Sequence, residues 1–488
     1  MAKLHAQLEP FVPSSTNAFD KVKAAHLLNR AAWGGTTDEI RKVVEMGPRR
    51  AVDWLLDFPD GAADEMSQTD MPDLSQIEGY PRSFNERRSL LQGKTAEERM
   101  LLQQQMNQAN QQAVRAVSTW WVRRMTKSPY PMHEKLTFFW HGHFTTSARD
   151  ERSAFAMWRQ NELLRTHAAG NFGKFVKAIS HDPAMLDYLN NQQNRKAQPN
   201  ENYARELMEL FTLGIGNYGE NDVKEAARAF TGWAHDGEDF IYRKYDHDED
   251  EKTFLGRRGN FDGNDVIDII LQQKACAPYI ASRFWRFFVN EEPDAAIVQS
   301  LGDVLRENDY ELRPMLRTLF ASKAFYDAKN IGSQIKSPVQ LVVSTVRTLE
   351  ITVPEFARLN GALQQMGQVP LMPPNVKGWP GGRQWINTST LFVRYNTSLW
   401  LAGGEMVTSG RPLIDRRNQR QKLQSGVAVK TDAEPAALVD EWVDRLIQRP
   451  IAEDKRGILL NAVGSKPDEQ SVRGMIKLIL SMPEYQLC

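Results

Sequence analysis

The chain has 488 residues, and 61 lysines and arginines balance 61 aspartates and glutamates. This length provides for a large hydrophobic core, and the charge balance excludes an overall basic surface for nucleic acid. Two cysteines, Cys276 and Cys488, exclude a disulfide framework and a cysteine-rich zinc module. No window reaches the roughly 18 apolar residues of a membrane span, and the N-terminus lacks an export signal. We therefore expect a cytoplasmic protein without a membrane span.

Helical periodicity predominates, which predicts a mainly α fold with one large multi-helix core and about 55–65% helix. Helices are expected at 18–32 and 37–57, and an exposed acidic loop follows at Asp60–Glu78. Residues 96–126 contain neither glycine nor proline and end on Trp120 and Trp121. They predict one long helix that projects at its polar start and docks at its aromatic end.

Further helices are expected near 131–141, 150–168, 172–180, 183–190, 201–213 and 222–232. Between 239 and 256 the periodicity changes. Phe240–Tyr245 and Lys252–Leu255 flank the acidic stretch His247–Asp250, which predicts one small β-hairpin insertion.

Helices resume at 264–274, 276–289, 294–306, 311–322, 338–350 and 388–402. The Pro- and Gly-rich stretch before the last of these contains Trp379 and is predicted to be an ordered loop. Residues 1–407 are expected to form the helical core. Residues 408–432 are predicted to be a mobile polar insertion, and 433–488 to be helices packed on the core.

The segment Pro131–Phe144 is the best candidate for a functional site. It places Glu134, His141 and His143 in an otherwise apolar and aromatic run. Burying such groups costs free energy unless partners satisfy them. Two histidines supply half of the donors that a metal needs. The alternative is structural, with the histidines bonded to backbone carbonyls.

A second candidate is the helix at 201–213. Glu206 and Glu209 are three residues apart on one helix, which is the spacing used by metal sites in helical bundles, but those sites have Glu-x-x-His and position 209 is Glu. In the alternative interpretation, Glu209 pairs with Arg205 on a solvated surface. The Arg228 guanidinium, on an apolar helix, must reach a carboxylate, a phosphate or a carbonyl.

Residues 373–385 offer Trp379 and Arg383 on a loop rich in glycine and proline, which suits a sugar, peptide or anionic ligand. A rigid lid is the alternative. His181, and the acidic group His247, Asp248 and Asp250, are weaker candidates. Asp182 is expected to be a helix cap, because Pro183 follows it directly.

Polar groups in apolar surroundings are best satisfied by one another, since each unpaired group costs about 1–3 kcal/mol. We therefore predict one pocket with three kinds of residue. Glu134, Glu206 and Arg228 are the expected catalytic residues. His141, His143 and Glu209 are the expected ligands of a divalent metal. Trp233, Trp379 and Arg383 are the expected substrate-binding residues, with the 373–385 loop over the mouth.

Six stretches resemble the bacterial family catalogued as domain of unknown function 1800: Phe139–Phe144, His181–Met185, Pro199–Gly214, Ala226–Trp233, Lys252–Gly256 and Pro373–Pro380. The resemblance extends over residues 24–405 and more weakly to the C-terminus. Because many relatives are encoded beside a phosphatase- or sulfatase-like protein, it implies such a partner. Some relatives carry export signals, so the resemblance leaves the compartment open.

Two functions follow from these patterns. The first is a metal-assisted enzyme, a hydrolase or oxidoreductase, that acts on a polar or anionic substrate in a helical pocket. The second is a non-catalytic helical scaffold that binds the phosphatase- or sulfatase-like protein. The chain has no dinucleotide-binding fingerprint, no Walker loop and no Gly-x-Ser-x-Gly elbow, which disfavours nucleotide-dependent transfer and familiar serine hydrolysis.

Overall fold

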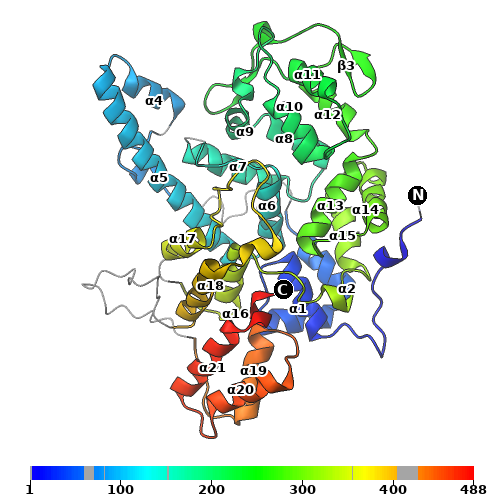
Figure 1. The fold of residues 1–488 in the computed structure, drawn as a ribbon, viewed down its shortest axis with the longest axis vertical. Coiled ribbons are helices and arrows are strands. Elements are labelled where there is room, and N and C mark those ends of the chain that lie inside the picture. Colours follow the sequence, from blue (N-terminus) through cyan, green and yellow to red (C-terminus); the bar gives the residue numbers. More distant parts are fainter. Residues whose placement is uncertain (1–2, 60–70, 82, 151–152, 354–355, 404–426) are drawn as a thin grey trace.

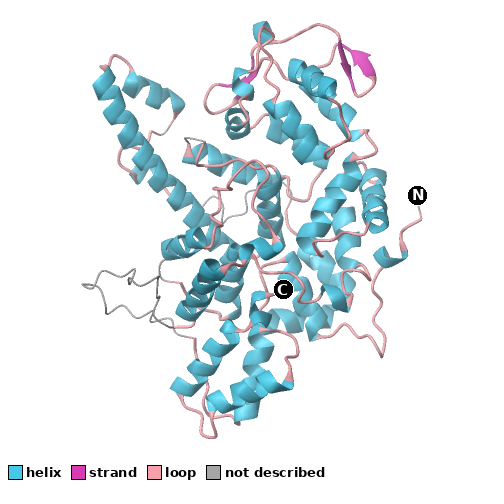
Figure 2. Cartoon of the chain, in the orientation of Figure 1, coloured by secondary structure: helices cyan, strands magenta, loops and turns pink. Residues whose placement is uncertain are grey.

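The computed structural model describes residues 3–59, 71–81, 83–150, 153–353, 356–403 and 427–488. Over this part of the chain the protein is mainly α-helical, with 61% helix and two antiparallel sheets of two strands each (Figure 2). The sequence-based prediction of the fold class is therefore confirmed. None of the described helices is long and apolar enough to cross a membrane.

The helices of the first half are α1 Lys21–Ala31, α2 Thr37–Leu56, α4 Phe84–Leu91, α5 Ala96–Lys127, α6 Pro131–His143, α7 Ala154–Thr166, α8 Phe172–Ser180, α9 Pro183–Tyr188, α10 Asn202–Glu206 and α11 Glu220–Ala229. Those of the second half are α12 Gly263–Leu271, α13 Cys276–Phe288, α14 Ala295–Glu307, α15 Leu312–Ala321, α16 Pro338–Thr348, α17 Phe356–Gln365, α18 Thr388–Leu401, α19 Pro435–Leu446, α20 Glu453–Val463 and α21 Glu469–Ser481. Immediately after α10, residues Leu207–Thr212 form a π-helical turn.

Helix α5 is the long helix that the sequence predicts. Its start is fixed by a capping box, in which the Thr95 hydroxyl accepts from the Glu98 N–H and the Glu98 carboxylate accepts from the Thr95 N–H. With α4 it forms an arm that projects from the body (Figure 1). Trp120 and Trp121 near its far end are buried, so the aromatic end is docked as expected.

The strands differ in pairing from the prediction. β1 Trp233–His235 pairs with β2 Phe240–Tyr242, and β3 Lys252–Phe254 pairs with β4 Arg257–Gly259. The predicted single hairpin of 240–245 with 252–255 was wrong, because each strand finds an antiparallel partner across a shorter turn. In the first turn the Asp236 carboxylate accepts the N–H groups of Glu238 and Asp239, which closes it locally.

Helix α6 lies where the two hydrophobic clusters of the protein meet. Every residue of α6 except Gly142 is buried. Leu136 and Trp140 belong to one cluster, formed chiefly by α1, α2 and α8–α15, whereas Phe138 belongs to the other, formed chiefly by α5 and α16–α21. The C-terminal helices α19–α21 pack on one another and on α16 and α18. Most of the expected mobile insertion at 408–432 lies outside the described residues, which include only 427–432 of it.

Candidate functional site

Two pockets share one wall, the Trp379 loop (residues 373–385). The carboxylate pocket, of about 1020 Å³, is lined by Pro374, Asn375 and Val376 of this loop together with residues of the 80–87, 150–156, 183–193 and 235–238 segments. The cationic pocket, of about 200 Å³, is lined by Lys377, Trp379–Gly382 and Trp385 of the loop and by residues of α6, α13 and the 291, 334–340 and 368 positions. A single ordered segment therefore separates two cavities of different chemistry.

The Trp379 loop is fixed to α6 and to the segment that follows it. The Leu371 N–H, just before the loop, donates to His141 Nε2 at 3.1 Å, and the Leu371 carbonyl accepts from Ala148 N–H at 2.8 Å. The Ser147 hydroxyl donates to the Pro373 carbonyl at 3.0 Å. Gly378 has φ +83°, and a Cβ there would lie 2.5 Å from the Gly142 carbonyl oxygen, so only glycine allows this approach.

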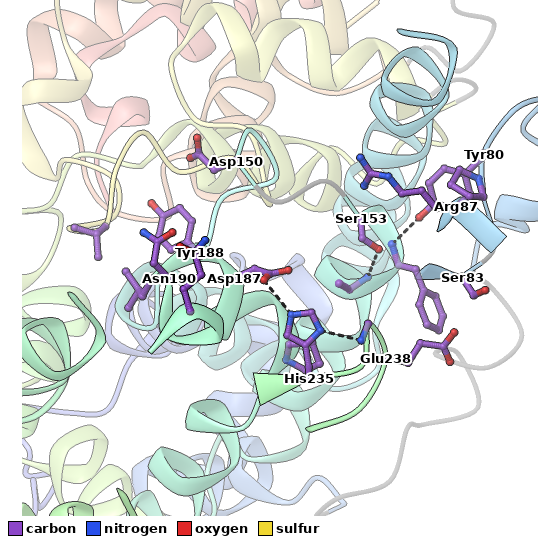
Figure 3. Close-up of a pocket in the computed structure, with 18 of the residues that line it drawn as sticks. Tyr80, Ser83, Arg87, Asp150, Ser153, Asp187, Tyr188, Asn190, His235 and Glu238 are labelled. Carbon is purple, nitrogen blue, oxygen red and sulfur yellow. Dashed lines mark hydrogen bonds and ion pairs between the residues drawn. The ribbon is translucent and has the colours of Figure 1, made fainter. Parts of the chain in front are cut away.

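The central feature of the carboxylate pocket is a contact between Asp187, at the end of α9, and His235, at the end of β1 (Figure 3). Asp187 Oδ1 lies 3.0 Å from His235 Nε2. The Asp187 side chain is 45% exposed, whereas that of His235 is only 6% exposed. The carboxylate is therefore the member of the pair that a ligand can reach.

The hydrogen bonds of His235 define its tautomer. His235 Nδ1 accepts from the Gly237 N–H at 2.9 Å, so in the neutral ring the proton is on Nε2, which faces Asp187. Gln192 holds the backbone of His235 on both sides, by accepting its N–H at 2.9 Å and donating to its carbonyl at 3.1 Å. The imidazole is thus held in place with Nε2 beside the Asp187 carboxylate, although Nε2 makes no hydrogen bond within the described part of the chain.

Behind this pair lies Asp182, the predicted cap of α9. It accepts from the Met185 N–H at 2.9 Å, which confirms the cap, and from Gln160 Nε2 at 2.7 Å. Burial raises the pKa of Asp182 to about 6, although these two hydrogen bonds and the charges of Arg159 and His235 act in the opposite direction. Asp182, a carboxyl group with a raised pKa, therefore lies buried behind the residues that line the carboxylate pocket.

The other walls carry polar and aromatic groups. Asp150 enters from the segment before α7, and Arg87 comes from α4 (Figure 3). Burial raises the pKa of Tyr188, and the charges of Asp150 and Glu206 add to the effect. Asn190 adopts a left-handed conformation with φ 59°, which asparagine tolerates better than other residues with a side chain.

Glu134 does not reach either pocket. It is fully buried and accepts from Arg165 Nε at 2.8 Å and from Trp121 Nε1 at 3.0 Å, and it also forms an ion pair with Arg124. Burial alone would raise the pKa of Glu134, but the charges of Arg165 and Arg124 lower it to about 2. The expected catalytic carboxylate is the centre of a buried ion-pair network that joins α5, α6 and α7.

The metal ligand set predicted from His141, His143 and Glu209 is not formed. Two residues apart on a helix, the histidines point about 200° apart: His141 bonds to Leu371, and His143 Nε2 donates to the Phe211 carbonyl at 3.0 Å. Burial lowers the pKa of each histidine to about 3, so both are neutral. Glu209 accepts from the Tyr218 hydroxyl at 3.0 Å. Across the described ranges, no group of three or more histidine, cysteine, aspartate or glutamate side chains is arranged to hold a metal ion.

Glu206 and Arg228 also lie apart. Glu206 is half-buried, and burial together with the charge of Glu209 raises its pKa, whereas Lys377 lowers it. Arg228 donates to Asp248 at 2.7 and 3.2 Å and to Glu225 at 3.0 and 3.1 Å. None of the six residues expected to converge lines either of the two pockets.

Among the expected substrate-binding residues, only Trp379 lines a pocket. Its ring stacks on Phe138 at 5.5 Å, in the wall of the cationic pocket. Trp233 is buried against His181, Phe230 and Phe240. Arg383 is exposed and lines neither pocket.

Sequence reasoning missed three residues that the pockets contain. Asp187 and His235 come from separate elements and carry no motif that links them. Lys135 did carry a signal, because it is a cation within the apolar run Pro131–Phe144, but it was not among the predicted site residues. Its side chain is 3% exposed, and burial lowers the pKa of Lys135 to about 7, with Arg30 and Lys336 adding to the effect and Cys488 opposing it.

The fold and the site define a mainly α-helical protein with a carboxylate–imidazole pair in a polar pocket. The chain belongs to the DUF1800 family, described as proteins of unknown function, whose family model matches residues 26–487. The sequence resemblance to this family is thereby confirmed over nearly the whole chain. No curated protein and no solved structure matches it.

Proposed function

We propose that the protein is a hydrolase that acts on a polar, hydroxyl-rich substrate, such as an oligosaccharide, bound in the carboxylate pocket. The observation that carries the proposal is the exposed carboxylate of Asp187, 3.0 Å from Nε2 of the buried His235, in a cavity of about 1020 Å³. A cavity of this size accommodates a ligand larger than a single sugar ring.

The charges and aromatic groups of the pocket favour this class of substrate. Its acidic side chains, Asp150, Asp187 and Glu238, outnumber its one arginine, Arg87, which disfavours a strongly anionic ligand. Carboxylates and amides exchange hydrogen bonds with hydroxyl groups, and aromatic faces cover the apolar faces of a sugar ring. The pocket supplies all three kinds of group: the amides are Asn190, Gln193 and Asn375, and the aromatic residues are Tyr80, Phe155 and Tyr188.

In this proposal Asp187 is the general base that takes a proton from the attacking water. His235 acts on Asp187 alone: its Nε2, 3.0 Å from the carboxylate, stabilises the negative charge, while Nδ1 remains engaged with Gly237. Asp150 is the second carboxyl group of the pocket, and glycoside hydrolysis commonly uses a pair of them.

The test is turnover of a panel of nitrophenyl glycosides and reduced oligosaccharides by the full chain. We expect hydrolysis by the native protein and a loss of about 10²–10⁴-fold in Asp187→Asn. Glu249→Gln, which removes an exposed carboxylate outside the pocket, is the matched control and should retain full activity. The proposal fails if no member of the panel is hydrolysed, or if Asp187→Asn is as active as the native protein.

A second candidate function, a scaffold for the phosphatase- or sulfatase-like protein, is favoured by the arm formed by α4 and α5. Leu90, Met100 and Leu101 on this arm are 42%, 63% and 52% exposed. Apolar side chains gathered on a projecting element suit a protein partner. Co-purification of that protein should be lost when Met100 and Leu101 are both changed to glutamate, and should persist when Gln103 and Gln104 are changed instead.

A further inference from the structure

The cationic pocket has a charge opposite to that of its neighbour. Its lining contains four cations, Lys135, Arg283, Arg286 and Lys377, and one carboxylate, Glu291. The Glu291 carboxylate packs against the backbone of Gly382, at the loop, and makes no ion pair with any of the four cations. The lining therefore presents an excess of positive charge.

The four cations have no carboxylate bound to them among the residues that the structure describes. In the described part of the chain, none of their side chains makes a hydrogen bond or an ion pair, although Glu206 lies near enough to Lys377 for their charges to interact. The buried arginines Arg165 and Arg394 differ in this respect: Arg165 bonds to Glu134, and Arg394 donates to Gln486 and to the Lys336 carbonyl. Of the four cations Lys135 is buried, and a buried cation without an anion is costly.

Lys135 is the innermost of the four. Its Nζ lies 4.4 Å from the centre of the Trp33 ring and 5.6 Å from that of Phe287, so aromatic faces cover the ammonium group, and the charge of Cys488 also favours it. Such contacts stabilise an ammonium group but leave its hydrogen-bond donors unused. An anion in the pocket would engage them.

The rest of the lining is aromatic. The Trp379 loop contributes Trp379, which stacks on Phe138, and Trp385. Helix α6 contributes Phe139, and helix α13 contributes Phe287. The volume of about 200 Å³ is below the usual range for drug-sized ligands, but a cavity of about 150 Å³ can hold benzene, so the occupant is restricted to about one small substituted ring.

We propose that the cationic pocket is a binding site for a small organic anion, whose carboxylate or phosphate group lies among Lys135, Arg283, Arg286 and Lys377 and whose apolar part lies against Trp379. This site is separate from the carboxylate pocket and does not depend on the hydrolase function. The arginines supply forked donors suited to either head group.

The experiment is a titration of the full chain followed by tryptophan fluorescence and calorimetry. The probes are phenyl phosphate and benzoate, with inorganic phosphate as the anion alone and benzyl alcohol as the ring alone. We expect saturable binding of at least one aromatic anion, at least tenfold weaker binding of inorganic phosphate, and none of benzyl alcohol. Comparison of the two aromatic anions identifies which head group the site prefers.

Variants separate a specific site from general electrostatic attraction. Arg283→Gln and Lys135→Met should each weaken binding of the preferred anion at least tenfold. Arg383→Gln is the matched control, because Arg383 is an exposed cation of the same loop that does not line the pocket. It should bind as tightly as the native protein, and so should Asp187→Asn, which tests the other site.

Equal weakening by Arg383→Gln and Arg283→Gln would overturn the proposal, since both would then act only through net charge. Binding of benzyl alcohol as tight as that of benzoate would overturn it as well. If Lys135→Met fails to fold, the exposed Arg286 and Lys377 provide the test: the double change to glutamine should weaken binding, and unchanged binding would count against the site.

Discussion

His141 accepts a hydrogen bond from the backbone N–H of Leu371, with 3.1 Å between Nε2 and N. Leu371 is buried and has φ 70°, a conformation that costs a residue with a side chain about 1–2 kcal/mol. The bond helps to hold this strained residue at the start of the segment that leads into the Trp379 loop. His141 is thus a structural acceptor in this fold.

Replacement of His141 should therefore remove the hydrogen bond that holds Leu371. His141→Ala opens a cavity and leaves the Leu371 N–H unpaired, so we expect the free energy of unfolding to fall by about 2–4 kcal/mol. His141→Gln retains an acceptor and should lose less. Urea unfolding measures both. If a chelator destabilises the native protein but not His141→Ala, the metal interpretation is correct after all.

Glu134→Gln should be one of the most damaging single changes in α6. It leaves the guanidinium groups of Arg124 and Arg165 buried without their shared carboxylate, for an expected loss of about 3–5 kcal/mol. The control is Glu220→Gln, which breaks an exposed pair with Arg205 and should leave the Tm almost unchanged. A similar Tm for both variants would contradict the assigned role of Glu134.

The stability that Glu134 contributes should also depend on pH under acid conditions. The pKa of Glu134 in the folded protein, about 2, is below its ordinary value of 4.5. Its contribution to stability is therefore complete above pH 4.5 and is lost as the pH falls through 2. The stability difference between native protein and Glu134→Gln, from urea midpoints at pH 7, 4 and 3, should shrink below pH 4.5.

The stability that Asp182 contributes should change with pH in the opposite direction to that of Glu134. Because its pKa is raised from 3.8 to about 6, the stability that it contributes is complete below pH 3.8 and is lost as the pH rises through 6. Asp182→Asn can retain both hydrogen bonds, since Met185 N–H and Gln160 Nε2 donate to the same oxygen. The variant should gain up to about 3 kcal/mol relative to the native protein between pH 4 and pH 7. A constant difference in Tm across this range would contradict the raised pKa.

Gly378→Ala tests the close approach of the Trp379 loop to α6. The added Cβ would meet the Gly142 carbonyl oxygen at 2.5 Å, in addition to the cost of φ +83°. Gly216→Ala is the matched control, because Gly216 has φ +87° with no atom within 4 Å of its added Cβ. Both variants should lose about 1–2 kcal/mol from backbone strain, and Gly378→Ala should lose more and shift the fluorescence of Trp379. Equal losses would show that the contact is unimportant.

Lys135→Met should stabilise the protein in the absence of a ligand. The folded pKa of Lys135, about 7, is below its ordinary 10.5, so the cost of burying its ammonium is complete below pH 7 and is relieved as the pH rises toward 10.5. Methionine of similar shape avoids this cost, and we expect a gain of about 1–4 kcal/mol at pH 7 that shrinks by pH 9. Lys174→Met, at an exposed position, should show no such gain.

Helix ends could be predicted from the sequence because capping residues act over a few positions. Asp182 with Pro183 starts α9, and Gly214 stands with φ 80° just after the π-helical turn. The partners of buried polar groups could not be predicted in this way. Arg124 and Arg165, which pair with Glu134, lie 10 residues before it and 31 residues after it on other helices.

The expectation of a single convergent site failed for the same physical reason. Burial obliges Glu134, His141 and His143 to find partners, but a backbone N–H or carbonyl satisfies a histidine as well as another side chain does. Only the placement of the Trp379 loop at a cavity emerged from the sequence as the structure has it. It did so because a tryptophan on a Gly- and Pro-rich loop has to be packed against something.

The shared wall between the two pockets has a thermodynamic consequence. If an anion bound beside Trp379 changes the affinity of the neighbouring cavity for its own ligand by some factor, the second ligand must change the affinity for the anion by that same factor. Pro374, Asn375 and Val376 face one cavity while Lys377 and Trp379 face the other, so any displacement of this segment is felt on both sides. A cellular anion would then act as an effector of the larger cavity, and the coupling could be measured from either ligand.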